Sequence, residues 1–313
     1  MRIGTIAQHS NIGPTNNNSI VSNDIPGRLN DYPIWAWWDF TDPIAVGGGT
    51  TNIVNNFNNS CCSDGEGRYE QALQQTDDKG PYNKGLSTDS NVKGPHYYPP
   101  NNGSAYDNST LPGQDKFGFA RAHSTAASYM QFTNPSNLYQ NGFTIIMIID
   151  YLTVNTTQHE FLFKLQSSGK DITCYRQKNS NVLFLTGNSN DVINVYGDFF
   201  GETNAGDNNE NFNWIAFTVN GSGIPELYSR GKYQTPSVQY GNFGSTTIAS
   251  GATSVLFGED DSTSVANESN SPNMKIYEMI IYEKRLTSQE LYNIDGYIQN
   301  KYKSYQFGRI NGY

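Results

Sequence analysis

Acidic and amide side chains in two loops are the residues of this sequence best suited to chemistry. Asp207 and Glu210 bound one run, whose middle positions are asparagines, and Glu259, Asp260 and Asp261 form the other. Such oxygen-bearing side chains suit Ca²⁺, a hard cation that takes several oxygen ligands in a flexible geometry. Neither run has the D-x-D-x-D-G spacing of an EF-hand, so solvated loop acids are the simpler interpretation. The sequence predicts no cofactor and no metal site, with Ca²⁺ at these loops as the alternative.

Arrangements typical of enzymes are hard to find in the sequence. No histidine lies in a hydrolase elbow or beside a credible nucleophile; the histidines are His9, His96, His123 and His159. A glycosidase needs two carboxylates that face the sugar, whereas Glu278 is the lone acid of the apolar run 275–282. Gly47-Gly48-Gly49 lacks the Lys-Ser/Thr that completes a phosphate-binding loop. We therefore predict that the protein is not an enzyme.

Aromatic side chains could instead bind carbohydrate by stacking on sugar rings, while Asn and Asp side chains hydrogen-bond to the hydroxyl groups. The aromatic candidates are Trp37, Tyr97, Tyr98 and Tyr106, and the acids of the two loops join them. Successive residues of a strand face opposite ways, so core packing is the favoured role for Trp37 and its neighbour Trp38. Glycans are accordingly one expected class of partner.

The composition excludes several classes of protein. Lys and Arg number 20 and Asp and Glu 29, which gives 20 − 29 = −9 at pH 7, whereas nucleic-acid binding needs a concentrated basic surface. Aromatic residues make up 13% of the chain, too many for a disordered protein. No apolar run approaches the roughly 20 residues that span a bilayer, and no secretory signal is visible at Met1. We expect no nucleic-acid partner, no membrane insertion, and synthesis in the cytoplasm.

Short apolar runs, separated by residues typical of turns, predict β-strands along most of the chain. The densest are the aromatic run 34–40 and the continuous apolar run 143–150, which suits a strand buried on both faces. Further strands are expected at 129–132, 161–165, 172–175, 182–185, 192–196, 214–219, 226–228, 254–258 and 275–282. This succession predicts an all-β fold, a two-sheet antiparallel jelly-roll sandwich.

One helix is predicted near the end of the chain. Thr287 and Glu290 form a capping pattern typical of a helix start, and Leu286 is placed to act as a hydrophobic staple. The helical spacing then continues through Leu291, Ile294, Asp295 and Ile298, and Tyr302 extends the same face. We expect this short C-terminal helix to close the sandwich.

Two segments lack any regular period. Residues 1–31 hold Gly, Pro and a run of asparagines, and their apolar residues are isolated: Ile3, Ile6, Ile12, Ile20, Val21 and Ile25. Because such a segment cannot form its own core, we predict an extended N-terminal arm whose apolar residues bind neighbouring subunits. Residues 47–118 are also rich in Gly, Asn, Pro and Asp. We predict a long irregular loop there, within a single domain that covers residues 32–313.

Three stretches of the chain resemble a known family. The residues that carry the resemblance at the C-terminal end are Glu278, Tyr282, Arg285-Leu286-Thr287, Tyr297, Lys301 and Tyr302. This ending, the paired runs 213–217 and 227–231, and the opening run 34–42 resemble the concanavalin A-like, laminin G-like jelly roll. Ser229 and Arg230 depart from the Val and Asn usual at that turn. The resemblance implies the same sandwich fold with its C-terminal helix.

The irregular arm and the loops rich in Asn, Ser, Thr and Gly further resemble virion proteins of tailed bacteriophages. We therefore expect a structural component of a bacteriophage particle: a capsid decoration, head fibre or tail appendage, located in the virion. Residues 1–31 would anchor it and the lectin-like sandwich would be displayed. Its partners would be other virion proteins or copies of itself in a homo-oligomer. The alternative is a carbohydrate-binding module that adsorbs to host-surface polysaccharide.

Overall fold

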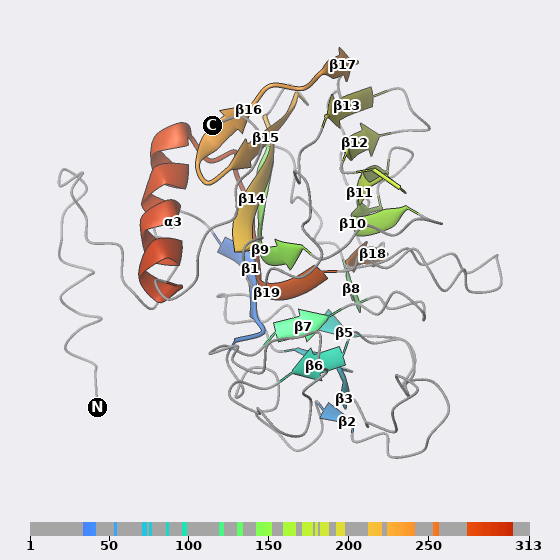
Figure 1. Ribbon diagram of the computed structural model, residues 1–313, viewed down its shortest axis with the longest axis vertical. Helices are drawn as coiled ribbons and strands as arrows, with labels where there is room; N and C mark the ends of the chain where they lie inside the picture. The colour runs from blue at the N-terminus through green and yellow to red at the C-terminus, as the bar shows by residue number, and fades with distance from the viewer. Residues whose placement is uncertain are drawn as a thin grey trace.

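A computed structural model describes most of the predicted strands and the helix. The described residues are 34–41, 53–54, 71–73, 75–76, 86–87, 96–98, 119–121, 130–133, 142–151, 159–166, 171–177, 179–180, 182–187, 192–197, 212–220, 224–241, 253–256 and 274–302. Over these residues the protein is a sandwich of two antiparallel sheets with helix α3 on the outer side of the first (Figure 1). The predicted sandwich with a C-terminal helix is therefore confirmed. The predicted arm, residues 1–31, lies outside the described residues.

Long strands that are buried throughout form the centre of the first sheet. They are β1 (Ile34–Asp39), β9 (Phe143–Tyr151), β14 (Phe212–Val219) and β19 (Met274–Tyr282). β9 lies between β14 and β19, and β1 pairs with the other side of β19. One face of these strands meets the second sheet and the other meets the helix, so both faces must be apolar. For this reason each of these strands is a nearly continuous run of apolar residues in the sequence.

Shorter strands extend the first sheet in both directions. Beyond β14 lie β15 (Pro225–Ser229) and β16 (Lys232–Gln234); beyond β19 lie β7 (Phe119–Arg121), β6 (His96–Tyr98), β3 (Gln71–Leu73) and β2 (Ile53–Val54).

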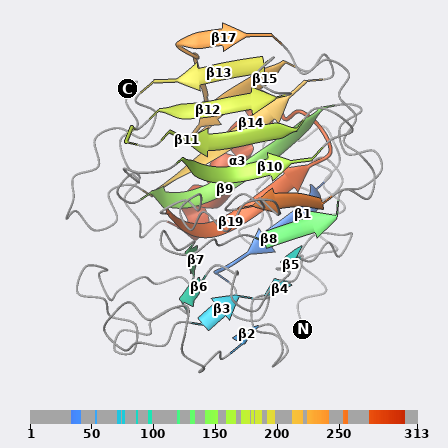
Figure 2. The same ribbon diagram turned by 90° about the vertical axis from the view of Figure 1, so that its right-hand side faces the viewer.

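The second sheet consists, in order, of β17 (Val238–Tyr240), β13 (Val192–Tyr196), β12 (Leu183–Gly187), β11 (Ile172–Arg176), β10 (Glu160–Leu165), β18 (Thr253–Leu256), β8 (Met130–Thr133), β5 (Leu86–Ser87) and β4 (Gln75–Thr76). Figure 2 shows this second sheet from its outer side.

Within residues 47–118, where the sequence predicts a long irregular loop, the structure describes only five short strands. Strands β2, β3 and β6 join the first sheet there, and β4 and β5 join the second. Each of these strands has only two or three residues. A two-residue period cannot be recognised over so few positions, which explains why the sequence shows no strand pattern here.

The helix begins where the sequence predicts. In α3 (Ser288–Lys301) the side chain of Thr287 accepts a hydrogen bond from the backbone N–H of Glu290, and the Glu290 carboxylate accepts one from the backbone N–H of Thr287, at 2.7 Å. This is the predicted capping box. The apolar residues of the predicted face are buried against the first sheet, and so is the predicted staple residue Leu286; the face residues are Leu291, Ile294, Ile298 and Tyr302. In the part of the chain that the structure describes, no helix is both long and apolar enough to cross a membrane.

A separate apolar cluster fills the space between the two sheets. Trp35 and Trp38 both belong to it, with ring centroids 5.3 Å and 5.4 Å from that of Phe132 on the second sheet. Trp37 belongs instead to the cluster under the helix. The opposite directions of Trp37 and Trp38 follow from the two-residue period of a strand.

Candidate functional site

A buried carboxylate joins the helix to the first sheet. Glu278 in β19 has no exposed surface. Its oxygens accept hydrogen bonds from Trp37 Nε1 at 2.7 Å, Tyr302 OH at 2.6 Å and Tyr297 OH at 2.9 Å, and from the Lys301 ammonium at 2.8 Å. A buried charge is tolerated only when it is paired and hydrogen-bonded. These contacts supply both conditions, and they connect β1, β19 and α3 at one point.

A second carboxylate lies beside this cluster. Asp39 is the cross-strand partner of Glu278, and Lys301 Nζ donates to its Oδ2 at 2.9 Å. Glu278 is therefore the one acidic residue of its strand, as the sequence shows, but a second acidic residue lies opposite it on β1. Burial by itself would lower the pKa of Lys301, but the charges of Glu278 and Asp39 outweigh burial and raise it. Because both acids are buried and share one cation, their arrangement supports the fold and leaves no room for a sugar between them.

The residues behind the family resemblance meet in this cluster. Tyr297, Lys301 and Tyr302, which carry the resemblance together with Glu278, all donate hydrogen bonds to the Glu278 carboxylate. Tyr297 and Tyr302 are completely buried, which raises the pKa of each phenol well above its usual value. The pattern therefore marks how the helix is attached to the sheet, and it carries no information about a ligand.

The structure tests few of the binding residues proposed from sequence. Trp37 is 4% exposed and its indole nitrogen is bound to Glu278; its ring cannot stack on a sugar, and the favoured packing role applies. Tyr97 and Tyr98 lie in β6, whose backbone alone is described. The remaining candidates lie outside the described residues: Ile3, Ile6, Ile12, Ile20, Val21, Ile25, Tyr106, Asp207, Glu210, Glu259, Asp260 and Asp261. Among the described positions, no group of His, Cys, Asp and Glu side chains could hold a metal ion.

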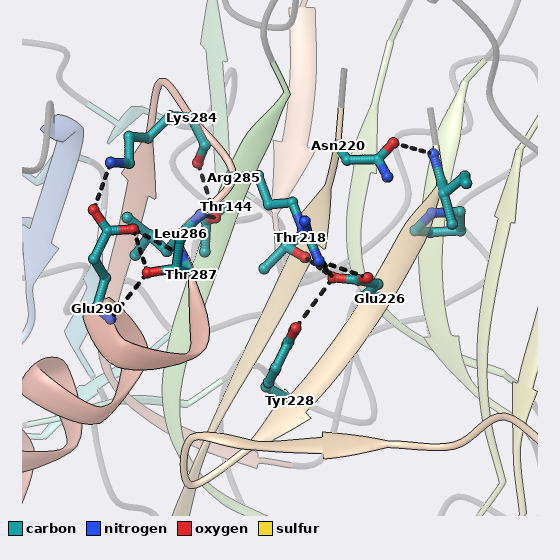
Figure 3. A network of polar contacts seen from close by, with 12 residues as sticks. Thr144, Thr218, Asn220, Glu226, Tyr228, Lys284, Arg285, Leu286, Thr287 and Glu290 are labelled. Atoms are coloured by element: carbon teal, nitrogen blue, oxygen red, sulfur yellow. Dashed lines mark hydrogen bonds and ion pairs between the residues drawn. The ribbon is translucent and has the colours of Figure 1, made fainter. Parts of the chain in front are cut away.

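A polar group on the outer side of the first sheet is the strongest candidate site in the described residues (Figure 3). The Arg285 guanidinium donates to both oxygens of Glu226, at 2.7 Å and 2.6 Å from Nη2 and at 2.9 Å from Nε. Thr218 Oγ1 and Tyr228 OH each donate to the same carboxylate at 3.2 Å. The Arg285 side chain is 39% exposed and that of Glu226 is 18% exposed. The pair is ordered by its neighbours and still open to a ligand.

An exposed tyrosine borders this polar group. Tyr233 in β16 is the cross-strand partner of Tyr228, and their rings meet edge to face with centroids 5.7 Å apart. Tyr233 is 49% exposed, whereas Tyr228 is 4% exposed. Burial raises the pKa of the Tyr228 phenol, and the hydrogen bond with Glu226 raises the pKa of Arg285. We call Tyr233, Tyr228, Glu226 and Arg285 the tyrosine surface.

A tight turn and a pair of hydrogen bonds from one threonine fix the geometry of the tyrosine surface. Arg230 and Gly231, with φ of 48° and 75°, make the two-residue turn that joins β15 to β16 and sets the pairing of Tyr228 with Tyr233. Thr144 Oγ1 donates to the Lys284 carbonyl and accepts from the Leu286 N–H, both at 2.9 Å. The loop that carries Arg285 is thereby held on both sides of that residue.

Local sequence patterns do not predict the tyrosine surface. Glu226 and Tyr228 appear only as members of a predicted strand, and Arg285 as part of a turn. Arg285 lies 59 positions from Glu226, so their contact depends on the paired sheet. Predicting this contact from the sequence would require knowing the register in which β14, β15 and β19 pair, and local patterns do not give that register.

Comparisons with known proteins give matches among solved structures alone. No family model matches the chain, and no curated protein matches it. Similar solved structures include the botulinum neurotoxin serotype D binding domain, at 12% identity and a TM-score of 0.47, covering 71% of this chain and 48% of that one. Another is a botulinum neurotoxin DC binding domain in complex with rat synaptotagmin II, at 16% identity and a TM-score of 0.45, covering 72% of this chain and 49% of that one. The chain spans about half the length of these structures.

Proposed function

We propose that this chain is a non-catalytic binding module that recognises carbohydrate at the tyrosine surface. The observation that carries the proposal is an exposed aromatic ring, Tyr233, packed against Tyr228. The Tyr228 hydroxyl in turn donates to Glu226, which forms an ordered and partly exposed pair with Arg285. A ligand that fits has an apolar face and a hydroxyl-bearing edge. Sugar rings have both.

The chemistry of each group matches one part of a sugar. The Tyr233 ring offers apolar surface to the C–H groups of a pyranose. Arg285 donates hydrogen bonds and Glu226 accepts them, so one hydroxyl group can interact with both at once. Because the two side chains already hold each other at 2.6 to 2.9 Å, little conformational entropy is lost when a ligand binds. Binding sites commonly combine apolar surface with a few fixed polar groups in this way.

A glycan array followed by calorimetry with the strongest oligosaccharide tests the proposal. Tyr233→Ala and Arg285→Ala should each weaken binding about tenfold or more, the loss expected when an aromatic or charge-assisted contact is removed. Tyr233→Phe keeps the ring and should bind as the unchanged protein does. Tyr292→Ala is the matched control, because Tyr292 is 68% exposed on α3 and is not part of the surface.

Two results would contradict the proposal. One is the absence of any array signal for the unchanged protein, in the presence and in the absence of Ca²⁺. The other is a signal that Tyr233→Ala and Arg285→Ala leave as strong as Tyr292→Ala does. Circular dichroism of each variant shows whether a lost signal reflects unfolding.

As a second candidate function we propose the display of this module on a bacteriophage particle, as part of a capsid decoration, head fibre or tail appendage. The supporting observations are the composition of residues 1–31, with isolated apolar residues and no pattern of their own, and the resemblance to phage virion proteins. Light scattering on the full chain and on a chain that starts at residue 32 tests the anchoring role. We expect an oligomer that becomes a folded monomer without the arm; equal masses would contradict it.

A further inference from the structure

We propose that the outer face of the second sheet is a separate binding surface for a linear, uncharged polysaccharide that lies across the strands. The surface is a row of apolar side chains, one on each of five neighbouring strands: Phe161, Tyr175, Phe184, Val195 and Val238. We call this the outer row. It lies on the opposite sheet from the tyrosine surface and does not depend on it.

Strand register places these residues side by side. Phe161 pairs with Tyr175, Tyr175 with Phe184, and Phe184 with Val195. Val195 in turn pairs with Val238, so the row reaches the edge of the sheet. Cross-strand partners share a face of the sheet. The sequence neighbours of the row point the other way, into the space between the sheets, as buried Cys174, Leu183 and Leu185 show.

The aromatic part of the row is ordered by contacts between its own rings. The ring centroids of Tyr175 and Phe184 lie 5.1 Å apart with planes 4° from parallel. Phe161 lies 5.3 Å from Tyr175 on the other side, and the His159 ring meets Tyr175 edge-on at 5.0 Å. Such contacts restrict side-chain rotation, so the surface is pre-ordered for a ligand.

The row is only partly covered. Phe161, Tyr175, Phe184 and Val195 are half-buried, and Val238 is 52% exposed. No labelled helix or strand stands in front of β10 to β13 when the sheet is viewed from this side (Figure 2). A contiguous row of partly exposed apolar side chains on a sheet face is the kind of surface patch that marks an interaction site.

Size and charge identify the occupant. Four steps between strands of about 4.8 Å make the row roughly 19 Å long, which accommodates several sugar units in line. A stable protein interface needs about 800 Å² on each partner, and a row one side chain wide provides far less. Lys164 is the one charged residue among the half-buried or exposed side chains described in β10 to β13 and β17. The net charge of −9 repels acidic polymers, which favours an uncharged one.

Thr173 and Lys164 add polar groups along one side of the row. They are cross-strand partners on β11 and β10, and both are half-buried. Thr173 lies two residues from Tyr175 on the same face of its strand. A polysaccharide whose C–H surface rests on the rings would therefore have hydrogen-bonding side chains at its hydroxyl-bearing edge.

Native gel electrophoresis of the full chain, through gels that contain linear glucan, xylan, galactomannan or dextran, tests this proposal. At least one polymer should retard the unchanged protein. Tyr175→Thr and Phe184→Thr should weaken that retardation about tenfold, while Tyr175→Phe and the control Tyr292→Ala should preserve it. Threonine suits an exposed strand position, and circular dichroism checks that each variant is folded. Hydrogen exchange on the unchanged protein should show protection of β10, β11 and β12 when the retarding polymer is added.

Each contrary outcome has a distinct meaning. If no polymer retards the protein, or if Tyr175→Thr and Phe184→Thr are retarded like the unchanged protein, the outer row is not a polysaccharide site. If light scattering shows a dimer that Tyr175→Thr dissociates, the row is an interface between copies of this chain and the proposal is wrong. Tyr233→Ala should leave the retardation unchanged; if it alone abolishes retardation, the polymer binds at the tyrosine surface and the outer row carries no site.

Discussion

Trp37 Nε1 donates a hydrogen bond to Glu278 Oε2 at 2.7 Å, although 241 positions separate the two residues in sequence. This contact joins the first strand of the sandwich to a strand near the end of the chain. Tyr297 and Tyr302 bind the same carboxylate from the helix. One buried acid therefore holds three elements together, and the helix that covers the first sheet depends on it.

Replacement of Glu278 should be one of the most destabilising single changes in the described core. Glu278→Gln keeps the volume but removes the charge that pairs with Lys301, and we expect a loss of about 3 kcal/mol in the free energy of unfolding, measured with urea. Trp37→Phe should lose about 1 to 3 kcal/mol because a buried acceptor loses its donor. The double variant should lose less than the sum, since the two residues are in contact.

Glu283→Gln is the matched control for Glu278→Gln, because Glu283 lies directly after the same strand and is only half-buried. It should change the free energy of unfolding by less than about 0.5 kcal/mol. Similar losses for the two variants would show that the Glu278 cluster does not stabilise the fold.

Stability should fall at alkaline pH. The pKa of Lys301 is raised above its usual 10.5, so its contribution is complete below that pH and is lost as the pH rises through the folded-state pKa. Tyr297 and Tyr302 act in the same direction: burial raises the pKa of each well above 10, and the unfolded chain alone can then ionise them. Urea unfolding between about pH 8 and 11 should show constant stability at first and a steep decline above about pH 10.

Tyr302→Phe provides the check on this alkaline decline. It removes one of the phenols, so its stability should fall less steeply with pH than that of the unchanged protein. An identical slope in the two proteins would assign the decline to groups outside the Glu278 cluster.

Two glycines should respond in opposite directions to substitution by alanine. Gly296 lies inside α3 and a Cβ atom there would meet nothing within 4 Å, so Gly296→Ala should stabilise the protein by about 1 kcal/mol. Gly142 has a φ of +86°, and a Cβ atom would lie 2.3 Å from the Val219 carbonyl oxygen. Gly142→Ala should therefore destabilise the protein by more than about 1 kcal/mol. Thermal unfolding of both variants measures this, and equal shifts in melting temperature would contradict it.

The sequence predicts the centre of the sandwich well, for a physical reason. β9 and β19 are buried on both faces, so they read as long apolar runs, and the predicted ends lie within one residue of the observed ones. The α3 cap is local, and Thr287 and Glu290 are sufficient to show it. β16 and β17 lie at the edges of the two sheets and are largely exposed. Without a buried face they have no apolar period, and the sequence does not reveal them.

The candidate site is less predictable than the fold. Trp37 lies in the run of the sequence that is densest in aromatic residues, yet its ring packs in the buried cluster under the helix. Tyr233 and Arg285 look ordinary in sequence, because what sets them apart is exposure and a contact made through sheet register. Sequence patterns therefore predict which residues are buried. They do not predict which exposed side chains come into contact through the pairing of strands.

The central claim, that carbohydrate binds at the tyrosine surface, is tested most directly by nuclear magnetic resonance on the unchanged, isotope-labelled protein. The oligosaccharide with the strongest array signal is added in steps while the backbone amide resonances are followed. The largest shifts should occur at Glu226, Tyr228, Tyr233 and Arg285, with the same dissociation constant for each. Shifts confined to other parts of the chain, or no shifts at saturating oligosaccharide, would contradict the claim.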